Sequence, residues 1–143
     1  MSDDHQGKFL VTEGEWAGWR ICQRDRFEIA AGPFYETAGE DGRIITAFRA
    51  GPEHLNGGGA VHGGCLMTLS DAALFAIADP ALGSSTGVTV SLTGDFVDAG
   101  RSGELIEATG EITRAAKSMI FVRGMISSNK RPILSFSGII KII

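Results

Sequence analysis

Residues 62–80 most constrain the fold, because they form an apolar helix directly after a glycine-rich turn. The turn and helix read HLNGGGAVHGGCLMTLSDAALFAIADP from His54 to Pro80. We expect the helix to begin near His62–Gly64 and to end by Pro80–Gly83, where proline and glycine form an ordinary stop signal. Its apolar side chains point nearly all round, which is typical of a buried helix and not of a surface helix. The remaining elements must therefore surround it.

Most of the remaining chain is predicted to form strands. Two are expected at Phe27–Thr37 and Arg43–Ala50, with a turn at Ala38–Gly42 between them and a loop at Gly51–Ala60 afterwards. Four more are expected at about 86–97, 103–114, 118–127 and 132–142. Each of these four contains an interior glycine, which marks a bend, a bulge or a close approach. The predicted class is α+β, with an antiparallel sheet wrapped around one long central helix.

Local patterns add three smaller expectations. Residues 1–8 should be frayed, and Glu13–Arg24 should form a short helix with Trp16 and Trp19 on one side. Between residues 88 and 93, Val, Val and Leu alternate with Thr, Ser and Thr, the period of a half-buried strand. This places Thr89 on the polar side of its strand.

Composition limits the classes of function. With 143 residues, the chain is most simply one domain, 1–143. Its net charge of -4, without a basic patch, argues against a nucleic-acid partner. The apolar runs are too interrupted for a membrane span, and the N-terminus lacks a signal-peptide pattern. Cys22 and Cys65 lie far apart and are expected to be reduced thiols in a cytoplasmic protein.

One carboxylate, Asp71, interrupts the apolar helix. A charge in such a helix is costly unless it is paired, hydrogen-bonded or used in chemistry. The residues leave three roles open for Asp71: a general base, a nucleophile, or a structural group bonded to a serine or threonine. Gly63 lies at the helix N-terminus, where free N–H groups favour developing negative charge. The plain alternative is that Gly63 and Gly64 only permit the tight turn.

Helix geometry separates these two candidate groups. Gly63 and Asp71 are eight positions apart, which is roughly 12 Å along one helix. A base and an oxyanion donor must both lie about 3 Å from the reacting atoms. Two antiparallel helices of a two-fold dimer could supply both groups, Gly63 from one chain and Asp71 from the other. Obligate oligomerisation is therefore expected if both residues function.

Four further residues have a structural and a functional interpretation. His62 can cap the helix or orient a ligand, and His54 has the same two options. Asn56 can orient a water molecule or brace its loop. Thr89 can be an ordinary surface hydroxyl. The sequence contains no phosphate loop, dinucleotide fingerprint, nucleophile elbow or metal-ligand spacing, so we expect neither a cofactor nor a metal.

Taken together, Asn56, His62–Gly63–Gly64 and Asp71 resemble the signature of hotdog-fold thioesterases. The nearest group is the PaaI-like (phenylacetate-degradation type) acyl-CoA thioesterases. The resemblance extends from about Phe27 to Ile142 and includes GVTVSLTGDF after the helix. Residues 1–24 lie outside it, and we expect them to cover the acyl pocket or a subunit interface. FVDAGRSG is a departure, because Asp98 stands where relatives often carry a basic or neutral residue.

The resemblance implies a hotdog fold and an enzyme that hydrolyses an acyl-CoA or aryl-CoA thioester to the free acid and CoA. Asp71 would be the catalytic base or nucleophile, and the partner's Gly63 N–H would polarise the carbonyl. Asn56 and His62 would position the water or the loop, and Thr89 would help to orient the water. The assembly would be a dimer or a dimer of dimers, with active sites between chains.

The resemblance also implies a pocket for an apolar acyl or aryl group. The substrate-binding residues expected for it are His54, Gly64, Leu66, Met67, Leu74 and Phe75. An alternative function is a non-catalytic acyl-CoA-binding or regulatory hotdog protein, in which Asp71 is structural. A hotdog dehydratase is a weaker third option, because the usual histidine–acid patterns are absent.

Overall fold

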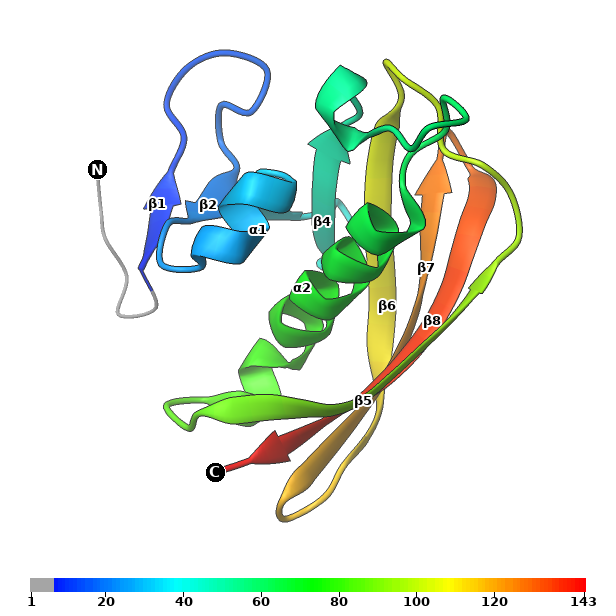
Figure 1. Ribbon diagram of the computed structural model, residues 1–143. Coiled ribbons are helices and arrows are strands. Elements are labelled where there is room, and N and C mark those ends of the chain that lie inside the picture. The colour runs from blue at the N-terminus through cyan, green and yellow to red at the C-terminus, as the bar shows by residue number, and fades with distance from the viewer. Residues whose placement is uncertain (1–6) are drawn as a thin grey trace.

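An eight-stranded antiparallel sheet curls around one long helix, α2 (Figure 1). The structure is a computed structural model and describes residues 7–143. The strands are β1 (Lys8–Leu10), β2 (Arg20–Cys22), β3 (Tyr35–Ala38), β4 (Ile44–Arg49), β5 (Gly87–Phe96), β6 (Leu105–Ala115), β7 (Met119–Ser128) and β8 (Arg131–Ile142). The helices are α1 (Arg26–Ala31), the short 3-10 helix η1 (Pro52–His54) and α2 (Gly63–Leu82).

The strand order is β1-β2-β3-β4-β6-β7-β8-β5. The strands predicted over 43–50 and from residue 86 onward are confirmed, and so is the antiparallel sheet around a central helix. Of the N-terminal segment, the described residues 7–24 contribute β1 and β2 to one edge of this sheet. Of the residues expected to be frayed, 1–6 lie outside the described part, and Lys8 belongs to β1.

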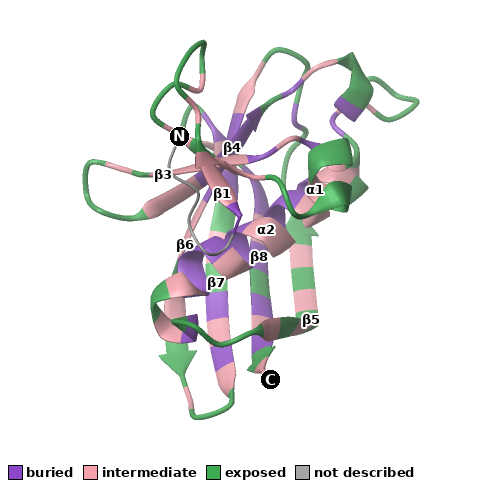
Figure 2. Ribbon diagram, turned by 90° about the vertical axis from the view of Figure 1, so that its left-hand side faces the viewer, coloured by how far each residue is buried: buried purple, intermediate pink, exposed green. Residues whose placement is uncertain are grey.

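Helix α2 is the centre of the core. Its buried residues pack with buried side chains of β4, β6, β7 and β8, and Leu69, Ala73 and Leu74 are each 0% exposed. Figure 2 shows buried and exposed bands alternating along the strands. By length and hydropathy α2 could cross a membrane, yet half of its most apolar window is buried inside this protein. Pro80 lies in the last turn, and the helix ends at Gly83, whose φ is 57°.

The interior glycines of the sheet mark close approaches, as predicted. Gly110 and Gly124 pair directly across β6 and β7. A Cβ on Gly124 would lie 2.4 Å from the Phe136 ring, and one on Gly138 would lie 2.3 Å from Leu74 Cδ1. The register shifts fall elsewhere, for example between Thr89 and Ser91. These glycines therefore let side chains of the core lie directly on the sheet backbone.

The prediction of a helix over 13–24 is wrong. Gly14 and Gly18 have φ values of 80° and 89°, which interrupt a helix, and residues 20–22 form β2 instead. The aromatic spacing belongs to a turn: Trp16 stacks on Tyr35 with ring centroids 4.3 Å apart. Tertiary stacking, and not helical periodicity, explains the position of these rings.

The predicted strand over 27–37 is wrong in its first half, which forms α1. Asp25 caps this helix, because its Oδ1 accepts a hydrogen bond from the Glu28 N–H at 2.9 Å. Aspartate followed three residues later by glutamate is a helix-start pattern. The apolar residues Phe27, Ile29, Ala30 and Ala31 suggested a strand instead. Helix α1 then packs against α2.

Candidate active site

The N-terminus of α2 is capped by His62. The His62 Nδ1 accepts a hydrogen bond from the Gly64 N–H at 2.8 Å, so the structural reading of His62 is the observed one. In the described chain no group accepts a hydrogen bond from the Gly63 N–H. The exposed ring of Phe96 lies beside Gly63, 3.2 Å from where a Cβ would stand. Gly63 therefore presents a free donor at a helix N-terminus, which suits a negative oxygen.

The loop before α2 is braced from within. The Asn56 Oδ1 accepts hydrogen bonds from the Gly58 and Ala60 N–H groups, at 2.9 and 3.1 Å. His54 is buried, and its Nε2 donates to the Gly32 carbonyl while its Nδ1 accepts from the Gly51 N–H. Both ring nitrogens of His54 are thus occupied by backbone groups. His54 therefore joins two backbone segments, and it is not among the residues that line the cavity beside Asp71.

Asp71 lies near the middle of α2 and meets Thr89 of β5. The Thr89 Oγ1 donates a hydrogen bond to the Asp71 Oδ1 at 2.6 Å. Within residues 7–143 no donor meets the other carboxylate oxygen, Oδ2. One oxygen is therefore held in place, and the second is available to a water molecule or to a substrate carbon.

The orientation of Thr89 corrects the expected alternation of β5. Val88 and Val90 are 41% and 50% exposed, while Thr89 points toward α2. A register shift between Thr89 and Ser91 turns the strand, so that Leu92 packs against the core. A bulge reverses which side chains face inward, and the local pattern of residue types does not show it.

Asp71 lines a cavity of about 700 Å³ between α2, α1 and the first strands of the sheet. Helix α2 contributes the carboxylates Asp71 and Asp79 together with Ala72, Phe75, Ala76 and Leu82. The opposite walls come from β1, β2, α1 and β3, and Lys8, Arg20, Cys22 and Arg24 of the N-terminal segment are among the lining residues. A cavity of this size can hold a small organic group.

The predicted acyl-pocket residues are only partly at this cavity. Phe75 lines it, but Leu66 and Leu74 are 2% and 0% exposed and belong to the core under the sheet. Met67 packs beside Gly94 and Gly64 lies at the helix start, both away from the cavity lining. All apolar helix residues look alike in sequence, whereas in the fold the sheet covers only some of them.

Sequence reasoning missed the polar part of the cavity. Glu28, Glu36 and Thr46 line it together with Asp71, although they come from α1, β3 and β4. Only Glu28 had a sequence signal, its position three residues after the capping Asp25. Nothing local in the sequence indicates that Glu36 and Thr46 share a cavity, because only the pairing of β3 with β4 brings them together.

Glu28 is half-buried and lies near other carboxylates. Burial raises the pKa of Glu28 to about 7, with further contributions from Asp25, Asp71 and Glu36 that Lys8 partly offsets. At neutral pH a fraction of Glu28 therefore remains protonated beside Asp71. Two carboxyl groups with different environments thus face one cavity.

The raised pKa of Glu28 predicts a pH-dependent stability. Its pKa is about 7 in the folded protein and near 4.5 when unfolded, so the folded state binds the proton more tightly. Stability should fall as pH rises from about 4.5 to 7 and then level off. In Glu28→Gln the decrease in the free energy of unfolding over this pH range should be smaller than in wild type by about 1 kcal/mol, a value that allows for solvent screening. Urea unfolding at pH 5 and pH 8 measures this change in the free energy of unfolding. The same pH dependence in wild type and in Glu28→Gln would contradict the assignment. The control Glu40→Gln, at an exposed site, should behave as wild type.

Asp98, the departure from the expected pattern, is held by Arg131. The Arg131 Nη1 donates to the Asp98 Oδ2 at 2.8 Å, and Arg131 also pairs with Glu104 at 2.7 Å. The hydrogen bond from Arg131 holds the pKa of Asp98 below its usual range. Its negative charge is therefore balanced locally.

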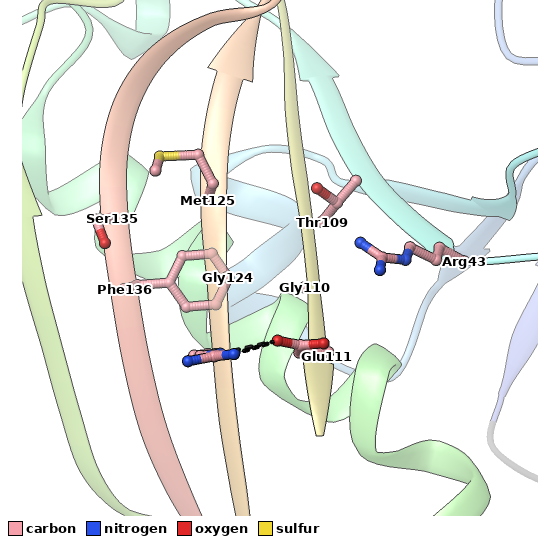
Figure 3. Close-up of a pocket in the computed structure, with 9 residues that line it drawn as sticks. Arg43, Thr109, Gly110, Glu111, Gly124, Met125, Ser135 and Phe136 are labelled. Atoms are coloured by element: carbon pink, nitrogen blue, oxygen red, sulfur yellow. Dashed lines mark hydrogen bonds and ion pairs between the residues drawn. The ribbon is translucent and has the colours of Figure 1, made fainter. Parts of the chain in front are cut away.

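A second, smaller hollow of about 290 Å³ lies on the outer face of the sheet (Figure 3). It is lined by Arg43, Thr109, Gly110, Glu111, Arg123, Gly124, Met125, Ser135 and Phe136. Two of these lining residues, Arg123 and Glu111, form an ion pair at 2.7 Å. None of the site residues predicted from the sequence lies there, so the cavity beside Asp71 is the candidate active site.

Comparison with known proteins decides the family. The model of the thioesterase superfamily matches residues 58–134, which include Gly63, Asp71 and Thr89. A candidate esterase of Pseudomonas aeruginosa is 32% identical over 109 residues, 76% of this chain and 81% of the relative. The chain belongs to the thioesterase superfamily. The resemblance found in the sequence is therefore confirmed.

Solved structures agree on the fold of this thioesterase. The BH2602 protein of Bacillus halodurans, crystallised with CoA, has a TM-score of 0.71 and 25% identity, covering 76% of this chain and 72% of that chain. The PaaI protein of Escherichia coli, from the phenylacetic acid degradation operon, has a TM-score of 0.72 and 21% identity, covering 84% and 86%. The predicted hotdog fold is confirmed by these likenesses.

Proposed function

We propose that this thioesterase hydrolyses an acyl-CoA thioester to the free acid and CoA, with Asp71 as the reacting carboxylate. The observation that carries the proposal is the Asp71–Thr89 hydrogen bond of 2.6 Å at the wall of the cavity. It fixes the Oδ1 of Asp71 and leaves the Oδ2 available to a water molecule or to the substrate carbonyl carbon. The CoA bound by the Bacillus halodurans protein supports a CoA ester as the substrate.

Asp71 has two routes to the products. As a general base it accepts a proton from water while the water oxygen attacks the thioester carbonyl, and CoA leaves as the thiol. As a nucleophile its carboxylate attacks that carbonyl and the C–S bond breaks, which gives a mixed anhydride and CoA thiolate; the thiolate takes up a proton, and water then hydrolyses the anhydride to the free acid and the Asp71 carboxylate. In both routes the carbonyl oxygen becomes negative in the transition state, and a donor must stabilise it.

We assign that donor to the partner's Gly63. Gly63 and Asp71 belong to one continuous helix and stand roughly 12 Å apart, too far to act on one carbonyl within a single chain. Strand β5 pairs only with β8 in the described sheet, and it exposes Val88 and Val90 at this edge. Unpaired apolar edges are covered in stable proteins. Pairing of two β5 edges across a two-fold axis completes both sites.

Thiol release from a panel of aliphatic and aryl acyl-CoAs tests the proposal. Turnover of at least one member, at a rate proportional to enzyme concentration, is the expected result. Saturable binding of the same esters without thiol release would overturn it in favour of an acyl-CoA-binding protein. Size-exclusion chromatography with light scattering on the same sample gives the number of chains in the assembly.

Gly63→Pro provides a specific test of the donor. Proline lacks an N–H but is tolerated at the first position of a helix, and the ψ of 133° at His62 suits a residue that precedes proline. We expect kcat to fall about 10²–10³-fold in Gly63→Pro, as for loss of one oxyanion donor. Gly63→Ala keeps the N–H and displaces only the exposed Phe96 ring, so it should retain most activity.

Mixed dimers then test the two-chain arrangement. Chains with Gly63→Pro and chains with Asp71→Asn are each inactive, but a mixed dimer contains one intact site. Random reassociation should restore about one quarter of wild-type activity, because half of the dimers are mixed and each has one of two sites. If both groups act within one chain, no activity returns on mixing.

A further inference from the structure

Helix α1 brings a second carboxyl group to the cavity beside Asp71. Glu28 belongs to α1, which packs beside α2 (Figure 1), and both Glu28 and Asp71 line the cavity. Among the described residues no donor forms a hydrogen bond or an ion pair with the Glu28 side chain. Thr46 is the one described residue with a fully enclosed side-chain oxygen that lacks a partner, so the oxygens of Glu28 keep access to the cavity. A molecule in the cavity can therefore meet this carboxyl group directly.

The charge of an ionised Glu28 is not balanced by a close cation. Burial disfavours the ionised form, and so do the three neighbouring carboxylates Asp25, Asp71 and Glu36. Lys8 of β1 is the one described cation whose charge favours it, but the Lys8 Nζ lies 2.7 Å from the Glu36 carboxylate. The other charged or titratable side chains that line the cavity are Arg20, Cys22, Arg24, Tyr35 and Asp79. Ionisation of Glu28 therefore adds a negative charge beside that of Asp71.

Hydrolysis changes the charge of the ligand in this cavity. The acyl part of a simple thioester is neutral, whereas the acid product carries a carboxylate at neutral pH. In the proposed reaction this carboxylate forms beside Asp71, which becomes negative again when its proton leaves. Like charges repel each other more strongly in a partly buried site than in bulk water. Substrate and product therefore differ in the property to which an ionised Glu28 responds.

We propose that Glu28 is a specificity-determining residue, which lets the cavity bind the neutral acyl ester and weakens the binding of the anionic acid. This inference rests on the proposed function, because it names the ligand charge that the same site selects. With Glu28 ionised, the product carboxylate faces the charges of both Glu28 and Asp71, while the ester has no charge to be repelled. Glu28 lies outside residues 58–134, which match the thioesterase family model.

The direction of the pH dependence follows from the charge of Glu28. Burial and the neighbouring carboxylates raise the pKa of Glu28 to about 7. An ordinary carboxylic acid in solution is ionised at both pH 6 and pH 8, so a change in its affinity between them comes from the protein. Binding of the carboxylate should weaken as Glu28 loses its proton. By linkage, a bound carboxylate raises the proton affinity of Glu28 by the same factor.

Inhibition of thiol release by hexanoate and phenylacetate, each compared with its neutral amide, tests the proposal. In wild type the inhibition constant of a carboxylate should rise about 3–10-fold between pH 6 and pH 8, while that of the amide stays constant. In Glu28→Gln this rise should disappear, and the carboxylate should bind more tightly at pH 8 than in wild type. Glu28→Asp, which keeps the charge, should retain the rise. The control Glu40→Gln, at an exposed turn, should behave as wild type.

Asp71→Asn separates the contribution of Glu28 from that of Asp71. Asparagine has no titratable charge, so the pH dependence of carboxylate binding that remains in this variant belongs to another group. Calorimetry should show that the pH dependence persists in Asp71→Asn and disappears when Glu28→Gln is added. Binding of the carboxylate at pH 8 should also take up protons in Asp71→Asn, and binding of the amide should not. A purely structural role of Glu28 would change the affinities for carboxylate and amide alike.

The proposed function and this inference fail differently. Absence of thiol release from every ester contradicts hydrolysis, and the dissociation constants of the carboxylates and amides then decide the inference alone. Equal affinity of wild type for the carboxylates at pH 6 and pH 8, or the same pH dependence in Glu28→Gln, would overturn it. So would a failure of both carboxylates to bind to wild type and to Glu28→Gln, because Glu28 would then not control their exclusion.

Discussion

Asp71→Asn should lower kcat for thioester hydrolysis by about 10²–10⁴-fold, the range for loss of a positioned base, and by more if Asp71 is the nucleophile. Asparagine has nearly the same shape and can still accept the hydrogen bond from Thr89 that holds Asp71 at 2.6 Å. It can neither take up a proton from water nor form an anhydride. Thiol release under single-turnover and steady-state conditions measures the effect.

Two controls make the result specific. Circular dichroism should show an unchanged fold in Asp71→Asn, and Asp41→Asn, at an exposed turn, should keep wild-type turnover. Wild-type turnover in Asp71→Asn would remove Asp71 from the chemistry. Mass spectrometry of wild type quenched during turnover separates the two routes, because only the nucleophilic route adds the mass of the acyl group to the peptide containing Asp71.

Leu69→Ala should destabilise the protein by about 2–5 kcal/mol. Leu69 is 0% exposed and lies in the core cluster where α2 meets the sheet. Truncation removes apolar contacts and leaves a cavity that the surrounding strands cannot easily fill, because their glycines already let neighbouring side chains rest on the backbone. Chemical denaturation of wild type and variant gives the difference.

The matched control is Leu10→Ala. Leu10 is 38% exposed at the edge strand β1, so its truncation should cost less than about 1 kcal/mol. An equal loss in both variants would show that α2 is not the centre of the core. In the proposed dimer folding and assembly are coupled, so both measurements should be made at the same protein concentration.

The strongest local patterns could be predicted correctly. The glycine-rich start, the apolar run and the final glycine defined α2, and regular alternation with short turns defined β6, β7 and β8. These elements depend on interactions between near neighbours, so their signals are present in short windows of sequence. The candidate site residues Gly63 and Asp71 could be singled out by their places on that helix, and Thr89 only by the resemblance to hotdog-fold thioesterases.

The N-terminal third shows where such windows fail. Aromatic spacing suggested a helix around Trp16 and Trp19, but stacking of Trp16 on Tyr35 and two glycines with positive φ formed a turn. The bulge in β5 turned Thr89 inward against the local pattern. In each case a partner distant in sequence, or a backbone irregularity, outweighed the local preference.

By itself, the sequence determined the central helix and the antiparallel class of the sheet. It also singled out Asp71, a carboxylate in an apolar helix that is costly unless it is paired, hydrogen-bonded or used in chemistry. Only the tertiary structure decided what surrounds that carboxylate. Pairing of β2, β3 and β4 brought Arg20, Glu36 and Thr46 into one row, and packing of α1 on α2 brought Glu28 to the same cavity. Periodicity reports which face of an element is apolar, but the walls of a cavity depend on which elements meet, and that is a property of the whole fold.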